Sequence, residues 1–138
     1  MKIQDIMTTN IETLGPTQSI RVAARKMSKS EIGFIPIVNE NGSLAGIITD
    51  RDISCFAVAM GHDPNTTEIQ KCMSTDIFTC YEDEVISVGA EKMEQNNVQR
   101  LIVLDRNDVM IGVVSVDDIA FFSRDLAGTV LQNARATH

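Results

Sequence analysis

Residues 46–53 read Gly-Ile-Ile-Thr-Asp-Arg-Asp-Ile, and residues 112–119 read Gly-Val-Val-Ser-Val-Asp-Asp-Ile. In both stretches a short apolar segment leads through a hydroxyl residue into acidic residues, a pattern typical of a strand that runs directly into a helix. The two stretches lie 66 positions apart, and Ile3 to Phe56 aligns with Ile69 to Phe122 without a gap. This spacing indicates a tandem duplication of one unit. The sequence divides accordingly into a first repeat over 1–62, a second over 63–125 and a tail over 126–138.

The composition is that of a globular protein built from two small repeats. The chain has 138 residues, of which 43% are hydrophobic and 4% aromatic. Each repeat is close to the size at which burial only just stabilises a fold, so we expect the two repeats to share one core. The net charge is -7, and no basic stripe with interleaved aromatic residues is present. We therefore expect no direct nucleic-acid partner.

The apolar segments and the cysteines indicate the cellular location that we expect for the protein. No apolar run approaches the roughly 20 residues that cross a bilayer, and the N-terminus lacks the pattern of a secretion signal. We expect a cytoplasmic protein without a membrane partner. Cys55, Cys72 and Cys80 occupy positions suited to small apolar residues, which favours buried free thiols. His62 and His138 have no neighbours at ligand spacing, so we expect no metal site.

Hydrophobic periodicity and turn residues predict the same elements in both repeats. Ser19 is a suitable N-cap for a helix over 20–30, and Asn41-Gly42 is suited to a hairpin turn with positive φ angles. The helix over 50–60 is apolar on almost every side, so we expect the second repeat or a second subunit to cover it. The full prediction places extended segments at 10–14, 33–38, 44–49, 76–80, 100–104 and 109–114, helical turns at 2–7 and 68–73, and helices at 20–30, 50–60, 85–96 and 116–124.

The repeated hydroxyl and acidic residues allow two interpretations. Thr49 and Asp52, like Ser115 and Asp118, have the spacing of a capping box, which would only stabilise a helix start. Alternatively, free N–H groups at a helix N-terminus suit a phosphate, and Arg51 could add a charged contact. A carboxylate one turn along can accept both hydroxyl groups of a ribose. Together these residues resemble half of a nucleotide site that occurs twice.

The repeat resembles the cystathionine-β-synthase (CBS) domain, and the chain resembles a stand-alone pair of such domains. The match covers residues 3 to about 122. It depends on the following segments and on their counterparts in the second repeat: Ile3-x-x-x-Met7-Thr8, Thr13, the Ala/Met helix, Phe34 to Val38, and Gly46 to Ile53.

The resemblance implies an α+β fold of two β-α-β-β-α repeats, packed with pseudo-two-fold symmetry and with a cleft on each side. Members of this family bind adenosine-containing ligands there, such as AMP, ADP, ATP, S-adenosylmethionine or NAD(H), and often form disk-shaped homodimers. For the first cleft the resemblance assigns Asp52 to the ribose, Thr49 and Arg51 to phosphate, and Ile11, Thr13, Ile35 and Pro36 to the base. For the second cleft it assigns Asp118 to the ribose, Ser115 to phosphate, and Ile77, Thr79, Leu101 and Ile102 to the base. Arg100 could reach phosphate from either cleft.

The two copies differ where charge matters. Arg51 corresponds to Asp117, Asp50 to Val116, and Pro36 to Ile102. An acid in place of a base disfavours phosphate, so we expect the site of Thr49, Arg51 and Asp52 to be the main nucleotide site.

We favour a sensor that binds a regulatory adenine nucleotide or S-adenosylmethionine, requires no cofactor, forms a homodimer and signals to an unknown protein target. The alternative is a structural homodimer with vestigial clefts. An enzyme is least supported, because the sequence shows no nucleophile–base pair, metal set, G-x-S-x-G motif or P-loop.

Overall fold

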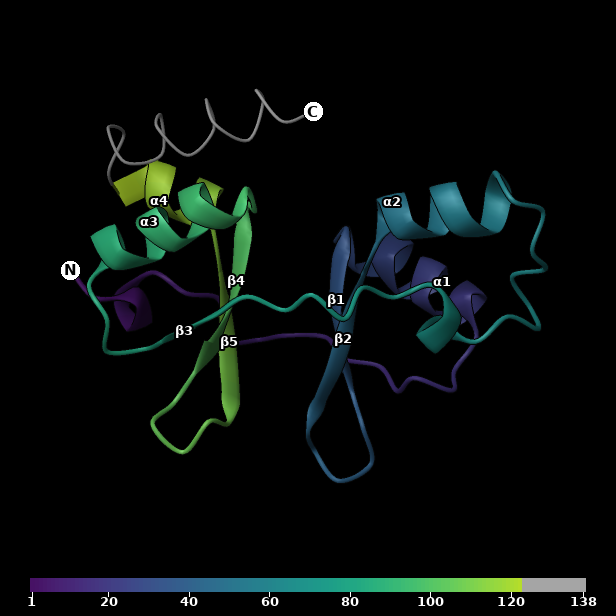
Figure 1. Cartoon of the computed structure of the whole chain (residues 1–138), viewed down its shortest axis with the longest axis horizontal. Coiled ribbons are helices and arrows are strands. Elements are labelled where there is room, and N and C mark those ends of the chain that lie inside the picture. Colours follow the sequence, from purple (N-terminus) through teal and green to yellow (C-terminus); the bar gives the residue numbers. More distant parts are fainter. Residues whose placement is uncertain (123–138) are drawn as a thin grey trace. The chain divides into compact units, whose positions relative to one another are not determined.

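The computed structural model describes residues 1–122, in which short helices alternate with strands (Figure 1). The chain divides into two compact units. Unit 2 is the continuous segment Glu12–Ile77, whereas unit 1 combines residues Met1–Ile11 with the chain from Phe78 onward. Each unit therefore contains most of one sequence repeat and the leading segment of the other.

Unit 2 contains an antiparallel hairpin and the helices packed against it. Its elements are α1 (Ile20–Ser30), β1 (Phe34–Val38), β2 (Leu44–Thr49), α2 (Asp50–Asp52), η2 (Ile53–Val58) and η3 (Ile69–Lys71). The predicted cap of α1 is confirmed, because the Ser19 side chain accepts a hydrogen bond from Val22 N–H at 3.3 Å. In the hairpin turn only Gly42, with φ of +87°, takes a positive φ angle, so the prediction of positive angles at both Asn41 and Gly42 is wrong for Asn41.

Unit 1 contains a three-stranded sheet. Its elements are η1 (Ile3–Asp5), β3 (Thr79–Tyr81), α3 (Ile86–Asn96), β4 (Arg100–Leu104), β5 (Met110–Ser115) and α4 (Val116–Phe122). β3 pairs in parallel with β4, and β4 pairs antiparallel with β5. The predicted order β-α-β-β-α and the α+β class are confirmed here. In unit 2 the corresponding first strand is reduced to one bridge, between Leu14 and Ile37.

The leading segment of each repeat bonds to the other repeat's second hairpin strand. Thr8 and Val113 exchange two backbone hydrogen bonds, of 2.9 and 3.0 Å. Ser74 and Ile47 exchange the equivalent pair, of 2.8 and 2.9 Å. We call residues 1–8 and 67–74 the two straps. Compact units and sequence repeats differ because the straps are exchanged between the repeats.

The hydrophobic core consists of two clusters, one in each unit. The described core residues gather around Ile3 in unit 1 and around Ile69 in unit 2, and a core shared between the two repeats stays a prediction. Both of these isoleucines are fully buried, and both lie in straps. Each cluster is therefore completed by an isoleucine from the other sequence repeat.

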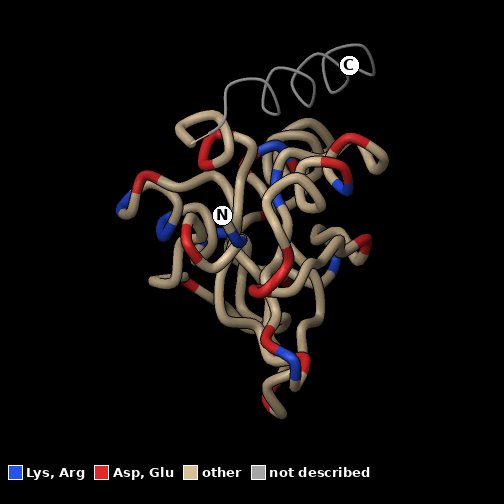
Figure 2. The backbone as a smooth tube through the Cα atoms, turned by 90° about the vertical axis from the view of Figure 1, so that its left-hand side faces the viewer, with Lys and Arg blue, Asp and Glu red and all other residues tan. Residues whose placement is uncertain are grey.

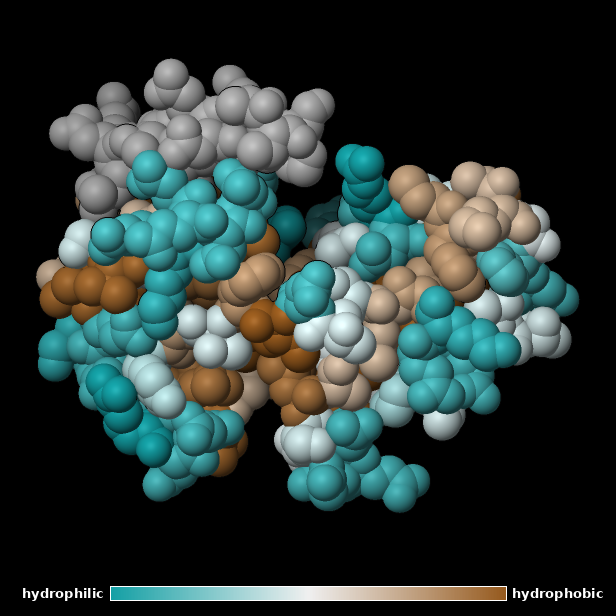
Figure 3. All heavy atoms as spheres, viewed as in Figure 1, coloured by the Kyte–Doolittle hydropathy of each residue, from teal (hydrophilic) through white to brown (hydrophobic). Residues whose placement is uncertain are grey.

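The predicted helix over 50–60 differs most from expectation. It consists of a single turn, α2, followed by a π-helix, η2, which ends at Val58. Val58 is 77% exposed and Met60 67% exposed, and apolar residues gather on the surface over η2 (Figure 3). Cys55 is exposed as well, so the prediction that all three thiols are buried is wrong for this residue. Within unit 2, Ile53 and Ala57 pack in the core, whereas Val58 and Met60 stay exposed.

Charged residues of both signs are scattered over the described backbone, as Figure 2 shows. No helix within residues 1–122 has the length and apolar content needed to span a bilayer. The predicted helix over 116–124 is present as α4 to Phe122. Its last two positions and the predicted tail over 126–138 lie outside the described residues.

Candidate functional site

The two predicted capping boxes are both present and have the same geometry. Thr49 Oγ1 accepts a hydrogen bond from Asp52 N–H at 3.1 Å, and Asp52 Oδ2 accepts one from Thr49 N–H at 2.9 Å. Ser115 and Asp118 form the same pair of bonds, at 3.1 and 2.8 Å. Each box holds a hydroxyl and a carboxylate at the point where a hairpin strand becomes a helix.

The backbone N–H groups of α2 are already engaged. Asp50 N–H donates to the Gly33 carbonyl at 3.1 Å, and Arg51 N–H donates to the Asp50 carboxylate at 2.8 Å. With Asp52 N–H bonded to Thr49, the expectation of free amides for a phosphate is wrong for this turn. The groups still able to bind an anion are side chains: the Thr49 hydroxyl, which keeps its own proton to donate, and the exposed Arg51 guanidinium.

In unit 1 strand pairing brings most of the predicted site residues onto one face of the sheet. Thr79 is opposite Ile102 in the register of β3 and β4, and Arg100 is opposite Ser115 in that of β4 and β5. Because paired residues point to the same face and neighbours in a strand alternate, these four side chains share one face. Leu101 points to the other face, where it belongs to the core cluster.

Unit 2 repeats this arrangement. Thr49 is opposite Phe34 in the hairpin, and Pro36, two residues further along β1, lies on the same face. Ile35 is fully buried in the core cluster on the opposite face. Thr13 is exposed and precedes Leu14, which belongs to that core.

Two predicted base-lining residues lie where the chain passes from one unit to the other. Ile11 is the last residue of the first segment of unit 1, and Ile77 is the last residue of unit 2. Ile11 was predicted to line the first cleft, whose other residues lie in unit 2. Ile77 was predicted to line the second cleft, whose other residues lie in unit 1.

The charged residues near the two hydroxyls differ between the units. Unit 2 has the cationic Arg51 in the first helical turn, whereas unit 1 has the acidic Asp117 there. In unit 1 the cation beside the hydroxyl comes from the strand, since Arg100 is opposite Ser115. Behind this face Lys92 Nζ donates to the Thr79 carbonyl and to Glu84 Oε1, both at 3.3 Å, and so fixes the backbone of Thr79.

Cys72 is a contact of the first box that the sequence interpretation missed. Its Sγ donates to the Asp52 carbonyl at 3.3 Å. Burial and, to a smaller extent, the Asp52 charge raise the pKa of the Cys72 thiol from 9.0 to about 11. The alignment of the two repeats could have indicated this residue, because Cys72 has a thiol that can donate a hydrogen bond where the first repeat has the purely apolar Ile6.

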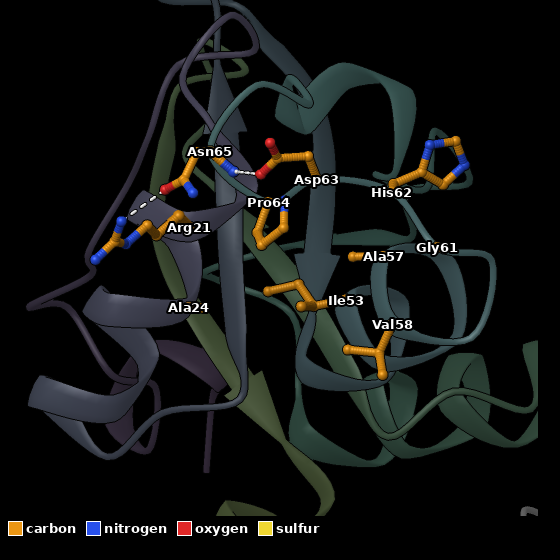
Figure 4. Close-up of a pocket in the computed structure, with 10 residues that line it drawn as sticks. All are labelled: Arg21, Ala24, Ile53, Ala57, Val58, Gly61, His62, Asp63, Pro64 and Asn65. Carbon is orange, nitrogen blue, oxygen red and sulfur yellow. Dashed lines mark hydrogen bonds between the residues drawn. The ribbon is translucent and has the colours of Figure 1, made fainter.

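An open groove of about 660 Å³ lies in unit 2 between α1, η2 and the linker that follows. It is apolar along Ala24, Ile53 and Val58, and one wall is fixed by a hydrogen bond of 2.7 Å from Arg21 Nη1 to Asn65 Oδ1 (Figure 4). The His62 ring points away from these side chains and stacks on Phe56 at 4.3 Å. Thr49, Arg51 and Asp52 do not line this groove.

Each box offers hydrogen-bonding groups that could hold a polar ligand. In each, a carboxylate and a hydroxyl lie side by side, which fits a ribose diol and a phosphate or other polar substituent. Within residues 1–122 no group of three or more His, Cys, Asp or Glu side chains is arranged to hold a metal ion.

Comparison with known proteins gives one consistent family. The model of the CBS domain matches residues 3–57 and 67–125. The CBS domain-containing protein YhcV of Bacillus subtilis is 35% identical over 133 residues, which cover 95% of this chain and 93% of YhcV. Homoserine O-acetyltransferase of Methanococcoides burtonii is 35% identical over 117 residues, but these cover only 23% of that enzyme.

A solved structure extends the likeness to three dimensions. The CBS domain pair of protein MJ0100 was crystallised in complex with methylthioadenosine and S-adenosyl-L-methionine. It is 31% identical to this chain with a TM-score of 0.79, over 91% of this chain and 97% of that one.

Proposed function

The chain belongs to the CBS domain family, and from this premise we propose that it is a regulatory module that binds an adenosine-containing ligand and signals to a partner protein. The observation that carries the proposal is the pair of boxes formed by Thr49 with Asp52 and by Ser115 with Asp118. The ligands of the MJ0100 pair, which are both adenosine derivatives, support this class of ligand.

For the ligand, we propose AMP, ADP, ATP, methylthioadenosine or S-adenosylmethionine. Asp52 accepts the ribose hydroxyls through Oδ1, because Oδ2 is bonded to Thr49 N–H. The Thr49 hydroxyl and Arg51 bind phosphate, while Pro36 and Thr13 contact the base from the same side of the hairpin. In unit 1 the corresponding groups are Asp118, Ser115, Arg100, Ile102 and Thr79.

The unit 2 site is the main nucleotide site in this proposal. Asp117 places a negative charge where unit 2 has Arg51, and like charges weaken the binding of a phosphate ester. We expect the unit 1 site to bind phosphate esters more weakly than the unit 2 site does, or to stay empty. The acetyl transfer of the Methanococcoides enzyme is not extended to this chain, because the match spans about a quarter of that enzyme.

The alternative function, a structural homodimer without a ligand, is favoured by one observation. Both boxes are complete as helix caps without any ligand, so capping alone accounts for their geometry. The exposed Arg51 has no part in capping and favours binding instead.

Thermal unfolding with and without AMP, ATP, methylthioadenosine and S-adenosylmethionine separates the two functions. A ligand at about 100 times its Kd adds about 2.7 kcal/mol to the free energy of unfolding. Asp52→Ala and Asp118→Ala each remove one helix cap, which lowers the free energy of unfolding by about 0.5–2 kcal/mol. We therefore expect the two variants to be equally stable. We expect Asp52→Ala to lose most of the nucleotide-induced shift and Asp118→Ala to retain it. Equal loss in both variants would contradict the assignment of the main site, and no shift in the unaltered protein would favour the structural homodimer.

A second copy of the chain is the proposed cover for the apolar face of η2. Val58 and Met60 protrude beside the groove of unit 2, an arrangement that allows two copies to pack the same surface against each other about a two-fold axis. Val58→Asp should shift the protein from dimer to monomer in light scattering after size exclusion. Val109→Asp, which alters an exposed valine of the unit 1 hairpin, should leave the dimer intact. A dimer that tolerates Val58→Asp would place the interface elsewhere.

A further inference from the structure

The start of α2 has a contact that the start of α4 lacks. Cys72, in the strap that packs on unit 2, donates its S–H to the carbonyl of Asp52 at 3.3 Å. The equivalent position in the other strap is Ile6, which belongs to the core of unit 1 and has no donor to offer. The two boxes contain the same internal hydrogen bonds, but they differ in the additional hydrogen bond that Cys72 donates to the Thr49–Asp52 box.

The thiol meets the helix where its hydrogen-bond register changes. Asp52 ends α2, and the next six residues form the π-helix η2, in which Ala59 N–H bonds to the Ser54 carbonyl five residues back. In unit 1 the described part of the corresponding segment, up to Phe122, belongs to the regular helix α4. Isolated π-helical turns are uncommon and occur frequently at functional sites. The position of Asp52 thus depends on a helix of unusual register and on the side chain that bonds to its carbonyl.

Cys72 is suited to act as a donor. A thiol of ordinary pKa is already protonated at neutral pH, and the rise of the Cys72 pKa to about 11 keeps the S–H in place at higher pH as well. Asp52 is consequently held at two points: its carboxylate by Thr49 N–H at 2.9 Å and its carbonyl by the thiol. Fixing a binding group in its bound position lowers the entropy lost when a ligand binds.

We propose that Cys72 is a positioning residue for the ligand site of unit 2, which sets the place of the Asp52 carboxylate through the hydrogen bond to the Asp52 carbonyl. The assignment goes beyond the proposed function and rests on it, because Asp52 must first be shown to bind the ligand. It names a residue outside the box, and from the other sequence repeat, as a determinant of affinity.

Titration calorimetry of the full chain with AMP and with methylthioadenosine tests the assignment. Cys72→Val removes the donor and keeps an apolar side chain of similar size, and we expect it to weaken binding about three- to tenfold. Cys72→Ser restores a donor and should regain most of that loss. Cys80→Val is the control, since Cys80 is a buried free thiol of unit 1 with no bond to either box. This variant should change stability without changing affinity.

The S–H stretching band in infrared spectra gives a readout that a purely structural role would not move. The Cys72 band, identified by its absence in Cys72→Val, should shift when the ligand binds to Asp52, whereas the Cys80 band should not. Unchanged affinity in Cys72→Val, or an equal loss in Cys72→Val and Cys72→Ser, overturns the assignment. Failure of the unaltered protein to bind either ligand is a different result, which overturns the proposed function and this inference with it.

Discussion

Arg51 and Asp117 stand at equivalent positions with opposite charges, and this pair is the sharpest difference between the two candidate sites. Arg51→Ala should weaken the binding of AMP and ATP roughly 10- to 150-fold, since a hydrogen bond to a charged group contributes about 1.5–3 kcal/mol. The binding of methylthioadenosine, which has no phosphate, should stay within a factor of two or so, because no charged contact is lost. Titration calorimetry with the three ligands measures the difference.

Arg25→Ala is the matched control for Arg51→Ala, because Arg25 is an exposed cation on α1 outside both boxes. Its removal changes the net charge equally and should leave all three affinities unaltered. If Arg51→Ala weakens methylthioadenosine as much as AMP, then Arg51 acts on the shape of the site rather than on phosphate.

Some contacts of the candidate site could be predicted from the sequence, and others could not. Thr49 and Asp52 are three positions apart in the chain, so their spacing alone predicts the hydrogen bonds that the structure contains. Cys72 is 20 positions from Asp52, and no local pattern links them. The engaged amides of α2 were also missed, because one of them bonds to Gly33, in the segment before β1.

Secondary structure was predictable where local signals determined it. The amphipathic period and the Ser19 cap predict α1 with its observed bounds, and the hairpin strands follow from apolar runs on either side of Asn39–Gly42. The helix after β2 was predicted as one regular element, whereas it changes to π-helical register after Asp52. Both registers suit an almost wholly apolar segment, so periodicity could not distinguish them. The contact at the change of register is made by Cys72, which lies in a strap 20 positions further along the chain.

The contact between straps and hairpins depends on two glycines. A Cβ atom at Gly46 would lie 2.6 Å from the Ser74 carbonyl oxygen, and one at Gly112 would lie 2.8 Å from the Met7 sulfur. We expect Gly46→Ala to lower the free energy of unfolding by about 1–3 kcal/mol, because the strap must move away from β2. Chemical denaturation followed by circular dichroism measures this loss.

Gly15→Ala is the control for Gly46→Ala, since its added methyl would meet Gln18 at an ordinary distance of 3.6 Å. Its effect should be neutral or stabilising by up to about 1 kcal/mol through the unfolded chain. Equal destabilisation by the two alanines would mean that strap contact is not what requires glycine at position 46.

At the scale of the whole chain, the exchange of straps predicts which fragments fold. A fragment of residues 12–77 contains the complete core cluster of unit 2, including the fully buried Ile69. A fragment of residues 1–62 follows the sequence repeat instead and lacks this side chain. Loss of a buried isoleucine and its neighbours costs several kcal/mol, about as much as a small domain has in total. We expect cooperative thermal unfolding, followed by circular dichroism, only for residues 12–77.

The two fragments are nearly equal in length, so each is the control of the other for size. A cooperative transition of similar midpoint in residues 1–62 would show that the strap contributes little to the fold. The sequence predicted the duplication but not this exchange, because an ungapped repeat is equally compatible with straps that stay in their own repeat.

Exchanged straps also bear on how such a chain could arise. In a solitary ancestral repeat that kept this pairing, the leading segment would have bonded to the hairpin edge of a second molecule. Two identical half-length chains, each lending its first residues to the other, would have formed a closed symmetric pair. Gene duplication and fusion would then have converted an association between molecules into one within a single chain. After fusion the two halves were free to diverge, and the difference between Arg51 and Asp117 is of the kind that such divergence produces.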